Sequence, residues 1–218
     1  MKNIVSINAS PRLNWNTATL VKEAEQGAAA QGANIIHFDL YKLEKFTGCI
    51  SCFGCKLSKN LGKCVCSDGL LPVLEAIRNA DGLIIGTPNY LGEPSSAFRA
   101  LYERLIFQYI TYKKENPTYN TRHIPVLFVM TSNVPSDAYE KGGMYEKMIS
   151  NYKSSLDYNV GKTKVLISGN TLQVDNYDMF NWSIFDPDKK KEYHENNFPK
   201  DKEKAFLLGG EMVTFPWK

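Results

Sequence analysis

The sequence has few of the residues on which hydrolytic enzymes depend. Only three of its 218 residues are histidine, and His37, His123 and His194 lie far apart along the chain. None belongs to a His-Glu-x-x-His helix, and no Ser–His–Asp arrangement is evident. We therefore expect that the protein is not a hydrolase.

The sequence also lacks a strong excess of charge. Lysine and arginine number 26 against 23 aspartate and glutamate residues, which leaves a formal net charge of +3. Proteins that bind nucleic acid or anionic membranes usually need a more basic surface. No apolar run approaches the ~20 residues of a membrane span, and the residues after Met1 lack a signal-peptide pattern. We expect a cytoplasmic protein with reduced cysteines and with no nucleic-acid or membrane partner.

Two common phosphate-binding motifs are absent. The sequence contains no Gly-x-Gly, which excludes the dinucleotide-binding fingerprint. Gly161-Lys162-Thr163 resembles the end of a Walker A loop, but Leu156 occupies the place of that loop's first glycine. A phosphate site in this chain is therefore expected to use other residues.

Cysteine is rare but concentrated. All five cysteines fall within eighteen residues, as Cys49, Cys52, Cys55, Cys64 and Cys66. Their odd number does not suit the disulfide framework of a secreted protein. Thiolates this close together bind soft metals or exchange electrons.

The cysteine spacing leaves three uses open. Cys49-x2-Cys52-x2-Cys55 has the compact spacing of iron–sulfur ligands, and Cys64 would complete a [4Fe–4S] site, with Cys66 as the alternative fourth ligand. Zinc held by Cys49, Cys52, Cys64 and Cys66 is a second use, because four thiolates satisfy its tetrahedral geometry. A loop of free thiols is the third.

Short apolar runs alternate with longer segments of helical period. The predicted strands are residues 4–7, 34–38, 82–86, 124–130 and 164–167. The predicted helices are residues 17–31, 68–80, 95–110, 142–156 and 200–213, with Asp68 expected to cap the second of them. Such alternation implies right-handed crossovers and an α/β fold with a doubly wound parallel sheet. Five strands with a polar turn after the first suit the flavodoxin-like order 2-1-3-4-5.

Two segments exceed this minimal pattern. One is the cysteine-rich insert after the second strand, at about residues 44–67, and the other is a polar connection at about residues 170–198. The connection contains Lys189-Lys190-Lys191, expected to form a solvated face, a lid or a subunit contact. No linker or repeat marks a boundary, so residues 1–218 are expected to form a single domain.

The first predicted strand leads directly into a polar turn and a helix start. Hydroxyl, amide and guanidinium groups beside the free amides of a helix start make a cradle for phosphate. The candidate phosphate ligands are Ser10, Arg12, Asn14, Asn16 and Thr17. The alternative is a capped helix that binds nothing. Together with the clustered cysteines, the turn points to a redox protein.

Three segments resemble the NAD(P)H-dependent FMN reductases and iron–sulfur flavoproteins, a flavodoxin-like group. Residues 8–17 resemble the group's Gly-Ser-Pro-Arg-x-x-Gly-Asn-Thr signature, and residues 86–92 resemble its second flavin loop. Residues 48–68 are similar to its cysteine insert. The resemblance covers the chain apart from about residues 170–198. Trp15 departs from it by standing where the group usually has glycine, and Thr131-Ser132-Asn133 replaces a glycine-rich third loop.

The resemblance implies an FMN-dependent NAD(P)H oxidoreductase that passes electrons to a quinone, nitro compound or protein acceptor. The turn after the first strand would hold the FMN phosphate. The residues implied at the flavin ring and third loop are Pro88, Asn89, Tyr90, Leu91, Gly92 and Thr131. The resemblance also implies a homodimer or homotetramer. The alternative function is an electron carrier without a nicotinamide site.

Overall fold

A twisted, mainly parallel sheet forms the centre of the molecule. The computed structural model describes residues 1–115, 117–214 and 217. Five parallel strands follow the spatial order β2-β1-β3-β5-β6, and the short β4 pairs antiparallel with β3. This is the predicted order 2-1-3-4-5 when only the parallel strands are counted. The strands are β1 Asn3–Asn8, β2 Asn34–Asp39, β3 Gly82–Tyr90, β4 Glu93–Pro94, β5 Val126–Thr131 and β6 Thr163–Ser168.

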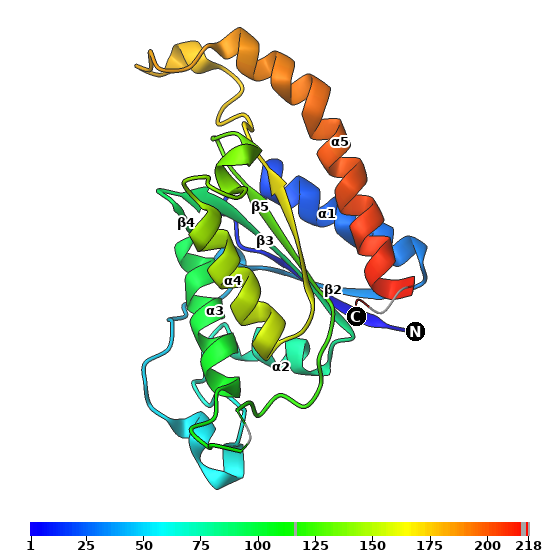
Figure 1. Cartoon of the computed structure of the whole chain (residues 1–218), viewed down its shortest axis with the longest axis vertical. Helices are drawn as coiled ribbons and strands as arrows, with labels where there is room; N and C mark the ends of the chain where they lie inside the picture. Colours follow the sequence, from blue (N-terminus) through cyan, green and yellow to red (C-terminus); the bar gives the residue numbers. More distant parts are fainter. Residues whose placement is uncertain (116, 215–216, 218) are drawn as a thin grey trace.

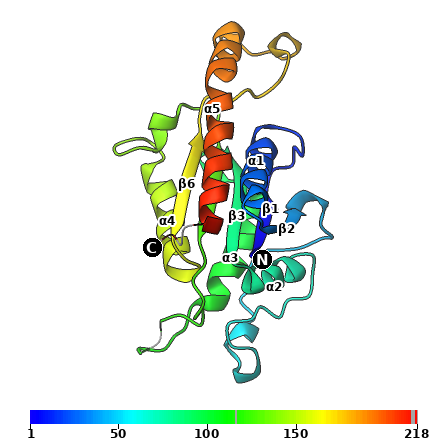
Figure 2. The ribbon, with the colours of Figure 1, turned by 90° about the vertical axis from the view of Figure 1, so that its right-hand side faces the viewer.

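Helices cover both faces of the sheet, which makes the α/β fold predicted from the alternating pattern (Figure 1). One face is covered by α1 Asn16–Ala30 and α5 Pro187–Thr214, which Figure 2 shows side by side. The other face is covered by α2 Leu71–Asn79, α3 Ser96–Tyr109 and α4 Glu146–Asn159. Successive residues of a strand therefore pack into two different cores. Ile84 faces α1 and α5, whereas Leu83 and Ile85 belong to the other core.

The closing helix is longer than the sequence predicted. It begins at Pro187 and not near Lys200, and it continues through Pro199. The prediction stopped at Pro199 because proline removes a helical hydrogen bond. The true start has ordinary helix signals: proline occupies its first position, and the Asp186 carboxylate accepts the Lys189 amide at 3.1 Å.

Two other predicted helix starts were wrong. Asp68 does not cap α2, which begins at Leu71 without a side-chain cap. Its carboxylate instead accepts the Leu70 amide at 3.0 Å and pairs with Arg104 at 2.5 Å. The helix predicted from Gly142 begins at Glu146, because Gly142 has a φ of +86° and residues 142–145 form turns.

The two additional segments lie toward opposite ends of the molecule (Figure 1). The insert, with 3-10 turns at Gly54–Lys56 and Ser58–Asn60, lies near the C-terminal end of α3. The connection after β6 lies beyond the carboxyl ends of the strands. That residues 1–218 form one domain stays a prediction. No helix in the described part of the chain has the length and apolar character needed to span a membrane.

Candidate functional site

A hollow of about 310 Å³ opens at the carboxyl ends of β1, β3, β5 and β6. This edge of an open parallel sheet is where α/β proteins bind ligands, and the size suits a small molecule. Four loops supply its walls. The lining residues are Ser10, Arg12, Trp15, Asn16, Thr17, Pro88, Asn89, Tyr90, Thr131, Ser132, Asn133, Thr171, Leu172 and Gln173.

The turn after β1 is fixed by its own side chains. The Asn8 side-chain oxygen accepts the Ser10 amide, and the Ser10 hydroxyl accepts the Arg12 amide, both at 3.1 Å. Arg12 is the only charged residue among those that line the hollow in the described structure. Its guanidinium lies 4.1 Å from the centre of the Trp15 ring and donates to the Gln173 carbonyl at 2.5 Å. The turn thus presents one cation at the rim of the hollow.

The start of α1 has free backbone donors. Trp15 is the N-cap residue but makes no side-chain cap, and the first bonded amide is that of Thr19, which donates to the Trp15 carbonyl. Within the described residues, the amides of Asn16, Thr17 and Ala18 have no acceptor. Three free amides and the positive end of a 15-residue helix suit a phosphate group. The residues present here therefore fit a phosphorylated ligand.

The loop after β5 completes the floor of the hollow. Thr131 is buried, and its hydroxyl lies 2.6 Å from the hydroxyl of Thr17, which joins this loop to the start of α1. The Thr171 hydroxyl donates to the Ser132 carbonyl at 3.0 Å. This bond joins the loop after β5 to the connection after β6. The predicted site residue Thr131 is thus brought next to the predicted phosphate turn.

The end of β3 and the turn after it contribute only part of the predicted set of flavin-ring residues. Pro88, Asn89 and Tyr90 line the hollow, but Leu91 and Gly92 do not. These two residues form the tight turn between β3 and β4 with φ values of 56° and 86°, and the Leu91 side chain is fully exposed. Burial raises the pKa of Tyr90, and the neighbouring Tyr41 raises it further.

Of the predicted phosphate ligands, only Asn14 lies away from the hollow. Its exposed side-chain oxygen accepts Lys22 on the surface at 3.5 Å. The other four, Ser10, Arg12, Asn16 and Thr17, line the hollow.

The sequence prediction missed the contribution of the connection after β6. The Leu172 carbonyl accepts the Trp15 indole at 3.0 Å and the Asn16 side-chain amide at 2.8 Å. Residues 171–173 therefore lie directly against the turn after β1. Their position after a parallel strand was a usable signal, because all carboxyl ends of a parallel sheet meet at one edge.

Lys190 holds the connection against the same site. Although it belongs to a run of three lysines, its side chain is buried, while Lys189 and Lys191 are exposed. Its ammonium donates to the Asn133 side chain at 2.6 Å and carbonyl at 2.9 Å, and to the Asn170 side chain at 2.5 Å. Burial lowers the pKa of Lys190 to about 8. The prediction that residues 189–191 form a solvated face is therefore wrong for Lys190.

The cysteines surround a separate pocket beside α3. All five are free thiols, and all five line it together with Arg104, Phe107 and Gln108 of α3. Burial raises the pKa of the Cys55 and Cys66 thiols. Among the described residues, no group of three or more His, Cys, Asp or Glu side chains is arranged so that it could hold a metal ion. The metal assignment to Cys49, Cys52, Cys55 and Cys64 stays a prediction.

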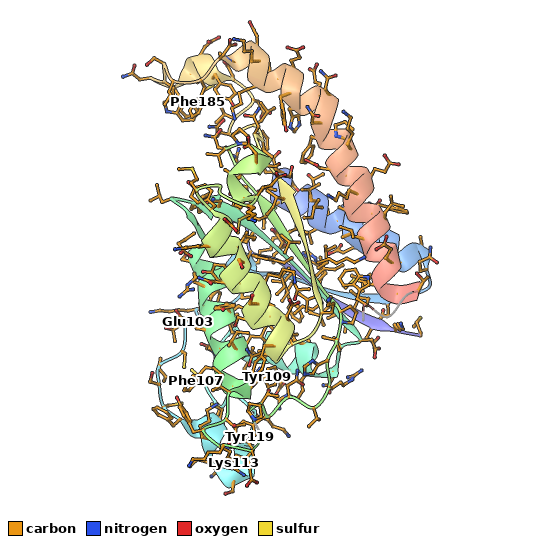
Figure 3. The ribbon with its side chains drawn as sticks, in the orientation of Figure 1. Glu103, Phe107, Tyr109, Lys113, Tyr119 and Phe185 are labelled. Carbon is orange, nitrogen blue, oxygen red and sulfur yellow. The ribbon has the colours of Figure 1, made fainter. Side chains whose placement is uncertain are left out.

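Helix α3 fixes the insert at several points (Figure 3). Glu103 accepts the Cys49 amide at 3.2 Å, and buried Arg104 pairs with Asp68 at 2.5 Å. The Lys56 ammonium donates to the carbonyls of Phe107, Gln108 and Ile110 at the end of the helix. A lysine at this end is favourable because the last carbonyls of a helix lack partners. The pocket is thus held on a rigid element.

The chain is similar to known proteins in both sequence and structure. The family model described as NADPH-dependent FMN reductase matches residues 2–139. An iron–sulfur flavoprotein of Methanocaldococcus jannaschii is 34% identical over 101 residues, which are 46% of this chain and 50% of that protein. One from Archaeoglobus fulgidus is 31% identical over 103 residues, 46% of this chain and 47% of that protein. These matches span about half the length of the curated relatives.

Solved structures share the fold over nearly the whole chain. The NAD(P)H:quinone oxidoreductase from Methanothermobacter marburgensis has a TM-score of 0.71 at 14% identity, covering 97% of this chain and 96% of that one. An FMN-dependent NADH-azoreductase from Bacillus anthracis, solved with FMN, has a TM-score of 0.62 at 12% identity, covering 96% and 100%. At these identities the likeness concerns the fold alone.

Proposed function

The chain belongs to the NADPH-dependent FMN reductase family, and from this premise we propose that it is an FMN-dependent NAD(P)H oxidoreductase. The observation that supports the proposal most strongly is the hollow at the carboxyl ends of the strands. It joins one arginine, three buried threonine residues and the free amides of a helix start. Such a set suits the phosphate of FMN better than an uncharged ligand.

In this proposal the chain binds and orients the cofactor, and the cofactor supplies the redox chemistry. Ser10, Thr17 and the first amides of α1 would hold the phosphate, with Arg12 at the rim. Pro88, Asn89 and Tyr90 would lie along the ring, and Thr131 and Thr171 would close the opposite wall. When bound, FMN would accept a hydride from NAD(P)H and pass one or two electrons to an acceptor. No protein side chain is assigned as an acid or base.

The proposed acceptor is a small molecule such as a quinone, nitro compound or azo compound. The hollow is open to solvent beside Tyr90, which is 45% exposed, so a planar molecule would have access to the ring. The similar structures named quinone oxidoreductase and azoreductase support this class of acceptor. The predicted homodimer or homotetramer and the predicted site residues Asn14, Leu91 and Gly92 stay predictions.

A second function is favoured by the thiol pocket. Relatives of about one third identity are named iron–sulfur flavoproteins, and the insert gathers five cysteines around one pocket. We propose that Cys49, Cys52, Cys55 and Cys64 hold a [4Fe–4S] cluster, for which the thiol donor set is suitable. With such a centre the protein would pass electrons to a protein acceptor, and an electron carrier is the alternative to the reductase.

A comparison of FMN with riboflavin tests the main proposal. The two ligands share the ring and the ribityl chain, but only FMN has the phosphate. Two or more charge-assisted hydrogen bonds of about 1.5–3 kcal/mol each would make FMN bind about a hundredfold more tightly, or better. Titration of flavin-free protein with each ligand, followed by flavin fluorescence, measures the ratio. Equal affinities would contradict the assignment of the phosphate to this hollow.

A further inference from the structure

Two buried polar groups of α3 face the thiol pocket without a partner. Arg104 and Gln108 are 2% and 1% exposed, and both line the pocket. Within the described structure, the Arg104 Nε atom and the Gln108 Nε2 atom have no hydrogen-bond acceptor. A buried donor without an acceptor costs about 1–3 kcal/mol. Such groups therefore indicate that an acceptor belongs in the pocket.

The orientation of Gln108 is fixed by the opposite end of its amide. Its Oε1 atom accepts the Cys64 amide at 3.1 Å and Arg78 at 3.4 Å. Exchange of the amide oxygen and nitrogen would place a donor against both of these donors. The Nε2 group consequently points away from them, and Gln108 is one of the residues that line the pocket.

The other nitrogens of Arg104 are already used. Nη1 donates to Asp68 at 2.5 Å and Nη2 donates to the Cys66 carbonyl at 2.7 Å, which leaves Nε. A guanidinium stays protonated in proteins, and Asp68 is its ion-pair partner here. A permanent positive charge thus lies beside the Cys64 thiol in a buried site. Because Asp68 already balances this charge, what remains unsatisfied is the Nε–H donor, which a sulfur acceptor in the pocket would satisfy.

We propose that Arg104 and Gln108 are positioning residues that donate N–H···S hydrogen bonds to the iron–sulfur centre of the thiol pocket and raise its reduction potential. The inference rests on the proposal that the cysteines hold such a centre. Reduction adds negative charge to the cluster, and donors aimed at its sulfur atoms stabilise that charge. The two residues would therefore favour the reduced form without being ligands themselves.

The matched pair Gln108→Glu and Asn60→Asp tests the inference. Both variants exchange a side-chain amide for a carboxylate in or beside the insert, but only Gln108 lines the pocket. In Gln108→Glu, a carboxylate oxygen can still accept the Cys64 amide, whereas the Nε2 donor is lost. Anaerobic titration with dithionite, followed by electron paramagnetic resonance, gives the midpoint potential. We expect Gln108→Glu to make reduction at least tenfold less favourable, about 59 mV for one electron, and Asn60→Asp to change it much less.

Electron–nuclear double resonance of the reduced wild-type protein gives an answer that needs no variant. Donation from Nε and Nε2 predicts protons that couple to the cluster and disappear after exchange into D₂O. Their absence would overturn the inference, as would equal shifts in the two variants. Wild-type protein with full FMN but no iron and sulfide would overturn both this inference and the cluster, and would leave the FMN assignment intact. If the protein contains the cluster but Gln108→Glu leaves its midpoint potential unchanged, the inference is wrong and the cluster assignment stands.

Discussion

Arg12 lies on the open rim of the hollow, where the Trp15 ring and the Gln173 carbonyl hold its guanidinium in place. The planar guanidinium meets two phosphate oxygens at once, which a lysine ammonium does not do. Because the side chain is exposed, its removal leaves the core of the sheet untouched. Ligand binding and folding are therefore separable at this residue.

Replacement of Arg12 by alanine should weaken FMN binding and leave the fold intact. Loss of one charge-assisted contact of about 1.5–3 kcal/mol corresponds to about a tenfold to hundredfold rise in Kd. Isothermal titration with FMN measures the change. Arg122→Ala is the matched control, because Arg122 pairs with Asp81 on the surface and does not line the hollow. An unchanged Kd in Arg12→Ala would show that the phosphate binds elsewhere.

His37 gives the stability of the protein a pH dependence that is independent of any ligand. Its Nδ1 atom lies 2.5 Å from the Glu25 carboxylate, and its Nε2 atom lies 3.2 Å from that of Asp39. The hydrogen bond to Glu25 raises the pKa of His37 against the opposing effect of burial, and Asp39 adds to the rise. The folded protein therefore binds this proton more tightly than the unfolded chain does.

A group with a raised folded-state pKa stabilises the fold below its unfolded pKa, here about 6.5, and the gain is lost as pH rises through the folded value. We expect the difference in unfolding free energy between wild type and His37→Gln to shrink from about pH 6 to about pH 9. Urea unfolding across this range measures the difference. His123→Gln, at an exposed histidine, controls for loss of the residue type. A difference that is constant or grows with pH would refute the assignment.

Sequence reasoning found the residues that the chain presents in one contiguous turn, and missed those brought there from elsewhere. Ser10, Arg12, Asn16 and Thr17 follow β1 directly, so strand, turn and helix signals locate them together. Leu172 reaches the same place only because the connection after β6 folds back on α1, and its contact is a backbone carbonyl. Every residue has a backbone carbonyl, so the side-chain sequence does not indicate which carbonyl makes such a contact.

At the scale of the elements, α1 and α5 pack backbone against backbone at two glycines. A Cβ atom built on Gly27 would lie 1.8 Å from the Phe206 carbonyl oxygen, and one on Gly209 would lie 1.9 Å from that of Ala24. Glycine at these two positions lets the backbones approach to within contact. The seam fixes the C-terminal half of α1 against α5.

Gly209→Ala should separate the helices and destabilise the fold by about 1–3 kcal/mol, because the added methyl group meets rigid backbone. Gly210→Ala is the matched control in the same helix, since its Cβ would lie 3.3 Å from the Gly27 oxygen. Chemical denaturation measures both variants. If Gly209→Ala were no less stable than Gly210→Ala, the close approach would not be what holds these helices together.

The strands were predicted more accurately than the last helix. Runs such as Gly82–Ile85 are apolar throughout, which the covering of both sheet faces requires, and β3 was located from that pattern. The N-terminal half of α5 is polar, and its one buried residue is Lys190, so its period gives little signal. Lys190 contacts Asn133 and Asn170, which lie far from it in the sequence, so the local residue pattern does not predict these contacts.

At the scale of the whole molecule, α3 separates two sites. Ser95, at its start, donates to the Ala9 carbonyl beside the hollow at 2.6 Å. Arg104 and Gln108, in its second half, line the thiol pocket. A 14-residue helix is about 21 Å long, so the pocket lies well along its length from the hollow. The cofactor site and the thiol pocket can therefore be altered independently by substitution.

The central claim is that the hollow holds a flavin that reacts with a reduced nicotinamide. The most direct test mixes anaerobic, FMN-loaded protein with excess NADPH or NADH and follows the flavin absorption. Hydride transfer needs the nicotinamide within about 3–3.5 Å of the ring, and the open side of the hollow allows this approach. We expect the flavin to bleach rapidly and its colour to return when a quinone is added. Flavin that stays oxidised with both nucleotides, yet is reduced by dithionite, would contradict the reductase and favour the electron carrier.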